Sequence, residues 1–269
     1  MTLVSTEWLN NNLSKVKIFD ASWHLPNSNR DAKKEYLEKH IPGAMFWDVD
    51  EHSDKNSSYP HMISDSNYWT KMLLSFGIAD HDHIIVYDHS HLYSACRLWF
   101  VLRYFGHKKV SILNGGFQKW LKEKKPVTQK INRIDKADNY IINENNDWIK
   151  NKKQIDENIK SNSFVLVDAR NRERFKGKIE EPRSGLKKGC IPSSKNIYFR
   201  NCVNFKTNTF KTKSELINIF KENNVDYYKP TVFTCGSGVT ACVLGLAYFL
   251  ITDKNPVIYD GSFSEWGKK

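Results

Sequence analysis

Short apolar runs typical of buried strands alternate along this chain with longer segments whose apolar positions follow a helical period. The strand-like runs lie at residues 15–20, 83–88, 109–113, 164–168, 231–234 and 256–259. Helical patterns such as those at residues 65–76 and 95–105 lie between them. This alternation predicts parallel βα units with right-handed crossovers, and therefore open parallel sheets flanked by helices.

The pattern occurs twice, because landmarks of the first half recur at nearly constant separation in the second. The matching pairs are Asp20 with Asp168, His40-Ile41-Pro42 with Cys190-Ile191-Pro192, and Gly115-Gly116-Phe117 with Gly261-Ser262-Phe263. A polar, charged segment separates the copies, and its stretch 143–146 is predicted to be the least structured part. The sequence thus predicts domains at residues 1–125 and 148–269, joined by a linker at residues 126–147.

One cysteine stands where such a sheet normally binds its ligand. Cys235 follows the strand-like run 230–234 and precedes a loop that leads into the apolar helical run 242–250. The carboxyl ends of parallel strands carry the ligand site in folds of this kind. Loop N–H groups and the positive end of the helix dipole stabilise negative charge on sulfur there. Cys235 is therefore a candidate nucleophile, and a buried structural cysteine is the alternative.

The loop Cys235-Gly236-Ser237-Gly238-Val239-Thr240-Ala241 resembles the active-site loop of the rhodanese superfamily, and within it the 3-mercaptopyruvate sulfurtransferase branch. The thiosulfate branch usually has Arg-Lys where this chain has Gly236-Ser237. The resemblance implies two tandem rhodanese-like domains covering essentially the whole chain. It also implies transfer of sulfur from 3-mercaptopyruvate, through a persulfide on Cys235, to a thiol or cyanide, with release of pyruvate.

The resemblance also implies the residues that bind the donor. They are the loop residues Gly236, Gly238, Val239 and Thr240, together with the two arginines Arg174 and Arg183. The planar guanidinium matches a carboxylate through two parallel hydrogen bonds, which suits an anionic donor. Arg170 and Arg172 lie nearer the strand end, so we expect them to form salt bridges instead.

The mercaptopyruvate branch further uses a Ser-His-Asp arrangement. Its counterparts here are Ser237 in the loop, His61 and Asp50. A hydroxyl oriented by a histidine, which an aspartate orients in turn, is suited to moving protons during the reaction. Because His61 lies in the first half and Ser237 in the second, we expect this site to form between the two domains.

The first half lacks the nucleophile. Aligning the repeats places Asp88 opposite Cys235, and an aspartate does not accept sulfane sulfur. The loop that follows Asp88 contains no glycine, so it does not easily gather its N–H groups around one centre. His81, His83, His89 and His91 form two H-x-H pairs, for which exposed loop histidines are a better interpretation than a metal site.

Composition limits the class of protein. The 269 residues include five cysteines, an odd number without C-x-x-C spacing, which favours a reducing compartment and a cytoplasmic location. We expect Cys96 and Cys190, which depart from the family pattern, to be buried fillers. The net charge is +11, but the lysines are scattered without interleaved aromatics, so nucleic-acid binding is disfavoured. No secretory or membrane-spanning segment is predicted, and no cofactor or metal is expected.

Three other functions remain open at this point. A cysteine-based phosphatase needs an arginine six residues after its cysteine, and that position here is Ala241, which disfavours it. A thiosulfate sulfurtransferase differs only in the donor. A non-catalytic rhodanese-like binding module would not need the complete loop. The expected partners are a small anionic sulfur donor and a thiol acceptor, with thioredoxin as one candidate.

Overall fold

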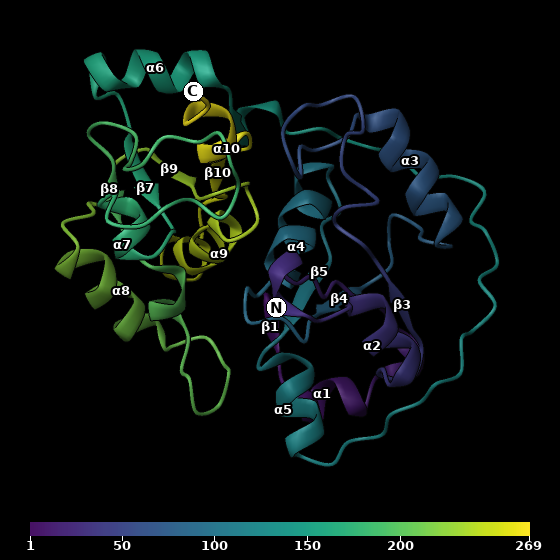
Figure 1. The fold of residues 1–269 in the computed structure, drawn as a ribbon. Helices are drawn as coiled ribbons and strands as arrows, with labels where there is room; N and C mark the ends of the chain where they lie inside the picture. Colours follow the sequence, from purple (N-terminus) through teal and green to yellow (C-terminus); the bar gives the residue numbers. More distant parts are fainter. The chain divides into compact units, whose positions relative to one another are not determined.

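Each half of the chain builds a five-stranded sheet in which every strand is parallel to its neighbours (Figure 1). The computed structural model describes all residues 1–269. The first sheet has the order β1 (Leu3–Val4), β5 (Val110–Leu113), β4 (Ile84–Tyr87), β2 (Lys17–Asp20) and β3 (Ala44–Phe46). The second has the order β6 (Ile149–Lys150), β10 (Val257–Tyr259), β9 (Thr231–Thr234), β7 (Val165–Asp168) and β8 (Lys195–Asn196). The identical order confirms the duplication and the predicted parallel sheets.

Helices connect the strands in both halves. Those of the first half are α1 (Thr6–Asn10), α2 (Ala32–Glu38), α3 (Ser66–Ser75), α4 (Ala95–Tyr104) and α5 (Gly116–Lys122). Those of the second are α6 (Lys152–Ser161), α7 (Arg172–Phe175), α8 (Lys213–Glu222), α9 (Ala241–Thr252) and α10 (Ser262–Trp266). Short 3₁₀ turns occur at Leu13–Lys15, Pro26–Ser28, Asn146–Trp148 and Phe199–Cys202. None of the helices is both long enough and apolar enough to cross a bilayer.

Alternating side chains along the central strands divide the core between the two faces of each sheet. In the second sheet, Val232 packs with Ile155 of α6 and Phe263 of α10. The next residue of β9, Phe233, contacts Phe220 of α8 and Tyr248 of α9 on the other face. A strand buried on both faces needs an apolar residue at every core position, which is why these strands are continuous apolar runs in the sequence.

Each half lends a short segment to the compact unit formed by the other half. The first unit comprises Met1–His52, Ser64–Asn145 and Phe205–Thr209. The second comprises Ser53–Ile63, Asn146–Asn204 and Phe210–Lys269. The two exchanged segments occupy equivalent places in the repeats. The first lies between β3 and α3, and the second lies between β8 and α8. The predicted domain and linker bounds stay a prediction.

The end of the predicted linker is better ordered than the sequence indicated. The N–H groups of Asn143 and Asn145 donate to the carbonyls of Phe105 and Tyr104 at 3.2 and 2.9 Å. The Asn145 side-chain amide also donates to the Tyr104 carbonyl at 3.0 Å. The polar stretch 143–146 was predicted to be the least structured part because it has no apolar pattern. In the structure Asn143 and Asn145 satisfy free carbonyls at the end of α4.

Two buried carboxyl groups distinguish the first sheet from the second. Asp20 accepts hydrogen bonds from the N–H and hydroxyl of Ser22 at 2.9 and 2.5 Å. Its equivalent, Asp168, is instead paired with the guanidinium of Arg170 at 2.6 Å. Burial raises the pKa of Asp20 to about 6, and burial raises the pKa of Asp88 to about 7. The first unit therefore holds two acids that the fold stabilises in the protonated form.

These raised pKa values predict that the two aspartates stabilise the fold less as pH rises. An unfolded aspartate loses its proton near a pKa of roughly 4, whereas Asp20 and Asp88 in the folded chain keep theirs up to about 6 and 7. Between those values the two carboxyls bind more protons in the folded chain, so their contribution to the free energy of unfolding decreases from roughly pH 4 to pH 7. Asp88→Asn should reduce this slope in urea titrations, whereas Asp135→Asn, at an exposed site, should leave it unchanged. An unaltered slope in Asp88→Asn would contradict the assignment.

Candidate active site

Cys235 lies directly after β9, at the carboxyl edge of the second sheet, and starts the loop that leads into α9. The side chain is buried, with 2% of the residue exposed. Its carbonyl accepts the N–H of Phe263 at 3.0 Å, which fixes the residue against the start of α10. The structure thus places Cys235 at the position where the sequence predicted a ligand site.

Two serines of the last βα turn hold the loop in shape. The Ser262 hydroxyl accepts the N–H groups of Cys235 and Gly238 at 3.2 and 3.1 Å. The Ser264 N–H and hydroxyl both donate to the Gly236 carbonyl, at 2.8 and 2.5 Å. Because these contacts join the start and the middle of the loop to one turn, the fold itself holds this part of the loop in place.

The contacts of these two serines with the loop were not predicted from the sequence. The alignment of the two repeats contained a hint, because Ser262 stands where the first copy has Gly116. Only the second copy therefore has a hydroxyl at this position that can accept N–H groups. Ser262 also has a positive φ of 50°, which is uncommon for a residue other than glycine and occurs where local contacts determine the backbone.

The remaining loop N–H groups face no acceptor within the chain. Those of Gly236, Ser237, Val239 and Thr240 have no hydrogen-bond partner, whereas the N–H of Gly238 is committed to Ser262. Gly238 has a φ of 78°, which requires glycine at this turn. The loop therefore offers several donors at the start of α9, an arrangement that stabilises a thiolate or a bound anion.

Ser237 and His61 meet in the second unit. Nδ1 of His61 lies 2.9 Å from the hydroxyl oxygen of Ser237, and both side chains are buried. His61 belongs to the segment Ser53–Ile63, which is part of the same compact unit as the loop. We expected these two residues to meet between domains because one lies in each half of the chain, but the exchanged segment brings them into one unit.

Asp260 anchors the segment that carries His61. Its carboxylate accepts the N–H of Ile63 at 2.8 Å, and Ser53 pairs with Ile63 in an antiparallel bridge. His61 itself has a left-handed backbone, with φ of 62°. The position of the imidazole is therefore set by the backbone of a closed loop. The contact of Asp260 with this segment was not predicted from the sequence.

Asp50 lies in the first unit. Its carboxylate accepts the indole N–H of Trp23 at 2.7 Å. The predicted role of Asp50 in orienting His61 stays a prediction.

Arg174 lies beside the loop. A Cβ added to Gly236 would lie 3.0 Å from Nη2 of Arg174, so glycine at this position lets the guanidinium approach the backbone. Nε and Nη2 of Arg174 donate to the two oxygens of Glu181 at 3.1 and 2.5 Å. Nη1 makes no contact of this kind, so it remains able to donate to a bound anion.

A buried charge network supports this arginine. Glu181 also accepts a hydrogen bond from Nη1 of Arg170 at 2.8 Å. Burial alone would raise the pKa of Glu181, but the hydrogen bonds and charges of Arg174 and Arg170 outweigh it and lower the pKa. The Arg170 guanidinium lies 3.7 Å from the centre of the Phe263 ring. The network links the arginine beside the loop to β7, which bears Asp168.

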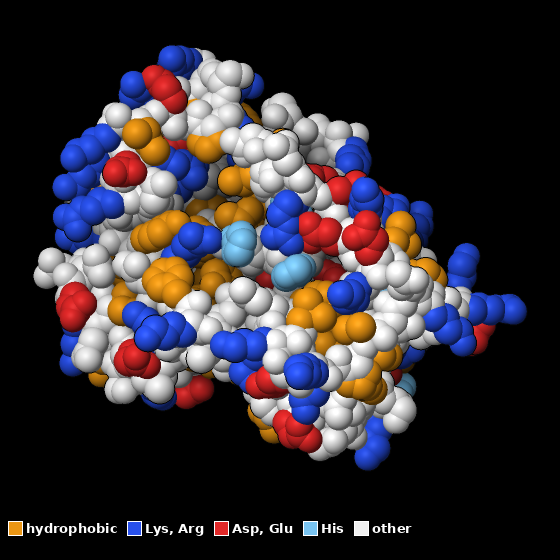
Figure 2. All heavy atoms as spheres, turned by 60° about the horizontal axis from the view of Figure 1, so that its bottom comes forward, with side chains coloured by type: hydrophobic (Ala, Val, Ile, Leu, Met, Phe, Trp, Pro, Cys, Tyr) orange, Lys and Arg blue, Asp and Glu red, His pale blue; other side chains and the backbone are white.

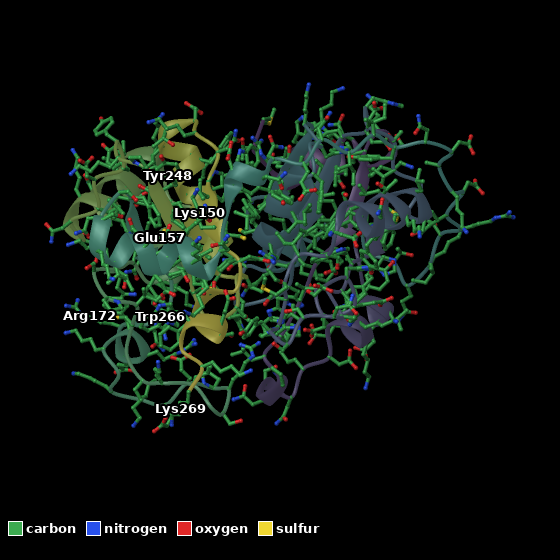
Figure 3. All side chains as sticks on the ribbon, turned by 90° about the horizontal axis from the view of Figure 1, so that it is seen from above. Lys150, Glu157, Arg172, Tyr248, Trp266 and Lys269 are labelled. Carbon is green, nitrogen blue, oxygen red and sulfur yellow. The ribbon has the colours of Figure 1, made fainter.

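The other three arginines named from the sequence lie in different environments. The predicted salt bridge of Arg170 is confirmed, but Arg172 is exposed at the edge of its unit and forms no ion pair (Figure 3). Residues two apart on a helix face different directions, so Arg172 points away when Arg174 faces Glu181. Arg183 is partly buried in the loop after Glu181, and its predicted contact with the donor stays a prediction.

The equivalent loop of the first unit is filled by its own carboxylate. The Asp88 carbonyl accepts the N–H of Phe117 at 2.8 Å, just as the Cys235 carbonyl accepts that of Phe263. The two carboxylate oxygens of Asp88 accept the N–H groups of Ser90 and Ala95 at 3.1 and 2.7 Å. The N–H groups that would stabilise a thiolate or an anion are therefore occupied, and no nucleophile is present.

The remaining cysteines and histidines form no second centre. Cys96 is buried as expected, but Cys190 is only partly buried, which corrects that prediction. His83 and His89 are partly buried rather than exposed, and His83 lies 2.8 Å from the Ser111 hydroxyl. No group of three or more His, Cys, Asp or Glu side chains is arranged to hold a metal ion. On the face drawn in Figure 2, Lys and Arg side chains are spread out, with Asp and Glu between them.

Comparison with known proteins matches both halves of the chain to one family. The Rhodanese-like domain family matches residues 5–123 and 151–269. The chain is 41% identical to a 3-mercaptopyruvate sulfurtransferase of Mus musculus, over 98% of this chain and 91% of that protein. It is 39% identical to a thiosulfate sulfurtransferase of Rattus norvegicus, over 99% and 92% respectively.

A solved structure shows the same architecture. SseA from Escherichia coli, described as a 3-mercaptopyruvate sulfotransferase with the rhodanese fold, superimposes with a TM-score of 0.88. The two chains are 32% identical, over 97% of this chain and 99% of SseA. Both halves of this chain thus match one family in sequence, and the whole chain matches a member of it in structure. The chain belongs to the rhodanese family and contains two copies of its domain.

Proposed function

We propose that this protein is a sulfurtransferase that carries sulfane sulfur on Cys235 and takes it from 3-mercaptopyruvate. The observation that carries the proposal is the loop after β9, where one buried cysteine starts a turn with four uncommitted N–H groups. Such donors favour the thiolate, which is the nucleophilic form of cysteine. The relatives named as sulfurtransferases support the same reaction.

The reaction has two steps. The Cys235 thiolate attacks the sulfur of the donor, a new S–S bond forms, and the donor's C–S bond breaks with its electron pair moving to carbon. The resulting pyruvate enolate takes up a proton and leaves as pyruvate. An acceptor thiolate then attacks the outer sulfur of the persulfide, which releases the Cys235 thiolate and leaves the sulfur on the acceptor.

Two features of the site support an anionic donor. Arg174 lies beside Gly236 and keeps Nη1 free, so it serves to bind the donor's carboxylate. The N–H groups of Gly236, Val239 and Thr240 stabilise charge on the persulfide or on the donor. On the family resemblance, Arg183 is proposed as the second arginine.

Ser237 and His61 are proposed to move protons. Their 2.9 Å contact allows the hydroxyl and imidazole to act as a relay when the donor thiol loses its proton and the enolate gains one. Asp50 is proposed to orient His61, as the family resemblance implies.

The second candidate function is thiosulfate sulfurtransferase, because relatives of that name match almost as well as the mercaptopyruvate enzymes. The loop favours mercaptopyruvate. Gly236 and Ser237 are neutral where the thiosulfate branch has two cationic residues, so the loop lacks an attraction that a dianion would use. Sulfite also leaves without a proton, so a relay through His61 brings it little benefit.

The acceptor is proposed to be a small thiol or a thioredoxin-like protein. A reducing, cytoplasmic location is proposed on the odd number of cysteines and the absence of C-x-x-C pairs.

Cys235→Ser should abolish sulfur transfer from either donor, because a hydroxyl does not form a persulfide. The fold should be retained, since serine is close to cysteine in size and the residue's backbone contacts remain. The matched control is Cys190→Ser, at a partly buried cysteine, which should keep wild-type kcat/KM. Substantial turnover by Cys235→Ser would show that another residue carries the sulfur.

Arg174→Ala should lower kcat/KM for 3-mercaptopyruvate by a factor on the order of 10²–10³, because one charge-assisted contact is worth about 2–4 kcal/mol in the transition state. The same loss is expected for Arg183→Ala. Arg172→Ala removes an equal charge from the same helix as Arg174 but at an exposed position, so it should have little effect. Wild-type kinetics in Arg183→Ala would remove that residue from the proposed site.

His61→Asn should lower turnover of 3-mercaptopyruvate much more than turnover of thiosulfate, since only the first donor needs the proton relay. Asparagine suits the left-handed backbone at this position, so the variant removes the imidazole without straining the loop. Ser237→Ala should show the same selectivity. Equal losses with the two donors would identify His61 as a structural residue, and a wild-type preference for thiosulfate would reverse the choice of donor.

A further inference from the structure

Residues of the first unit stand at the positions that correspond to Cys235, Ser237 and His61 of the second unit. Three pairs lie 147 residues apart in the two halves: Asp88 and Cys235, Ser90 and Ser237, and Asn208 and His61. Asn208 belongs to the segment Phe205–Thr209, which joins the first unit as the His61 segment joins the second. Asn208 and His61 also share a left-handed backbone, with φ of 59° and 62°.

The first unit also keeps an arginine–glutamate pair in matching geometry. Nε and Nη2 of Arg30 donate to the two oxygens of Glu35 at 2.7 and 2.6 Å. Arg174 uses the same two nitrogens toward Glu181. Nη2 of Arg30 also lies 3.4 Å from Nδ1 of His89, the residue directly after Asp88. In both units Nη1 of the arginine remains uncommitted.

A pocket of about 290 Å³ lies at this place in the first unit. Its walls are Arg30, His89, Ser90, His91, Gln118 and Asn208. The volume is slightly below the usual range for drug-sized ligands, so the pocket suits a smaller molecule. Neither Glu35 nor Asp88 lines it, and the Asp88 carboxylate is turned into its own loop, where it accepts the N–H groups of Ser90 and Ala95.

Arg30 and Gln118 supply the hydrogen-bond donors of the lining, since the Ser90 hydroxyl donates to the Trp23 carbonyl and the Asn208 amide to the Gly115 carbonyl. Arg30 provides a permanent positive charge, a quarter exposed, and Gln118 is exposed with a side-chain amide that bonds to no other residue. The Asn208 amide is fixed between the Gly115 carbonyl, at 3.0 Å, and the Tyr93 hydroxyl, at 2.8 Å, so it forms a rigid wall. A planar anion is the ligand that such a set recognises.

We propose that this pocket is a second, non-catalytic binding site for a small carboxylate of about the size of a 2-oxo acid. Arg30 holds the carboxylate through Nη1, and Gln118 donates to it from the rim. The ligand is bound without being converted, because Asp88 stands where the other unit has its cysteine. The site is independent of sulfur transfer at Cys235.

The test uses pyruvate as the probe and the Cys235→Ser variant, in which no turnover takes place. The ring resonances of His89 and His91 are followed by NMR during titration, at a pH well above the histidine pKa range so that Arg30 is the only cation in the pocket. Pyruvate should shift both resonances in a saturable manner. Adding Arg30→Ala should weaken that binding at least tenfold, whereas Arg133→Ala, at a residue whose side chain is 93% exposed, should leave it unchanged.

A second variant separates binding from local folding. Gln118→Glu leaves the Arg30–Glu35 pair intact but places a negative charge at the rim, so it should also weaken pyruvate binding. The proposal is overturned if pyruvate leaves the His89 and His91 resonances unshifted, or if the shifts persist unchanged in Arg30→Ala and Gln118→Glu. Turnover by the wild-type chain is measured in parallel, and its presence or absence bears on the proposed function alone.

Discussion

A buried anion is stable only where hydrogen-bond donors face it, and the loop after β9 offers such donors in the second unit. Parallel strands end at one edge of their sheet, so the loop after β9 and the turn before α10 lie together there. Ser262 and Ser264 use that proximity to fix the loop, and they leave four of its N–H groups free. The charge network of Arg170, Glu181 and Arg174 holds a guanidinium beside Gly236.

The same constraint explains why a duplicated fold yields one catalytic unit. In the first unit the N–H groups of the equivalent loop already have acceptors. That of Ser90 donates to Asp88, and those of His89 and Leu92 donate to the hydroxyls of Ser22 and Ser90. The Asp88 carboxyl group thus helps to hold the loop in shape and stands where the second unit has its cysteine. Burial raises the pKa of the Asp88 carboxyl to about 7, which shows that the loop's donors do not fully offset the loss of water.

The exchanged segments tie the two halves of the sequence together. His61 is encoded in the first half but contributes to the second unit, and Asn208 does the reverse. Both residues have left-handed backbones, which hold a short side chain at a fixed place beside the neighbouring loop. Asp260 secures the first of these segments through the backbone of Ile63. The proposed chemistry therefore depends on both halves of the chain, although the proposed sulfur carrier lies in only one of them.

The sequence predicted the central strands within one or two residues, because strands buried on both faces are unbroken apolar runs. It missed the edge strands, such as Leu3–Val4 and Lys195–Asn196, because two residues paired on one side leave no periodic signal.

Cys235 was predicted from its place between a strand and a helix, and Ser237 and His61 were predicted from the family resemblance. The roles of Ser262 and Asp260 were not, since they depend on how the last turn of the sheet meets two loops that are distant in sequence. Arg172 was assigned wrongly because the direction of a side chain on a four-residue helix is set by its neighbours.

Uptake of sulfur by Cys235, in the loop after β9, can be measured in a single turnover without an acceptor. The protein is mixed with 3-mercaptopyruvate, pyruvate is quantified, and the intact chain and its peptides are weighed by mass spectrometry. If Cys235 carries the sulfur, each chain releases one pyruvate, and the peptide that contains Cys235 gains the mass of one sulfur atom. Pyruvate release without that added atom, or the added atom on a different cysteine, would contradict it.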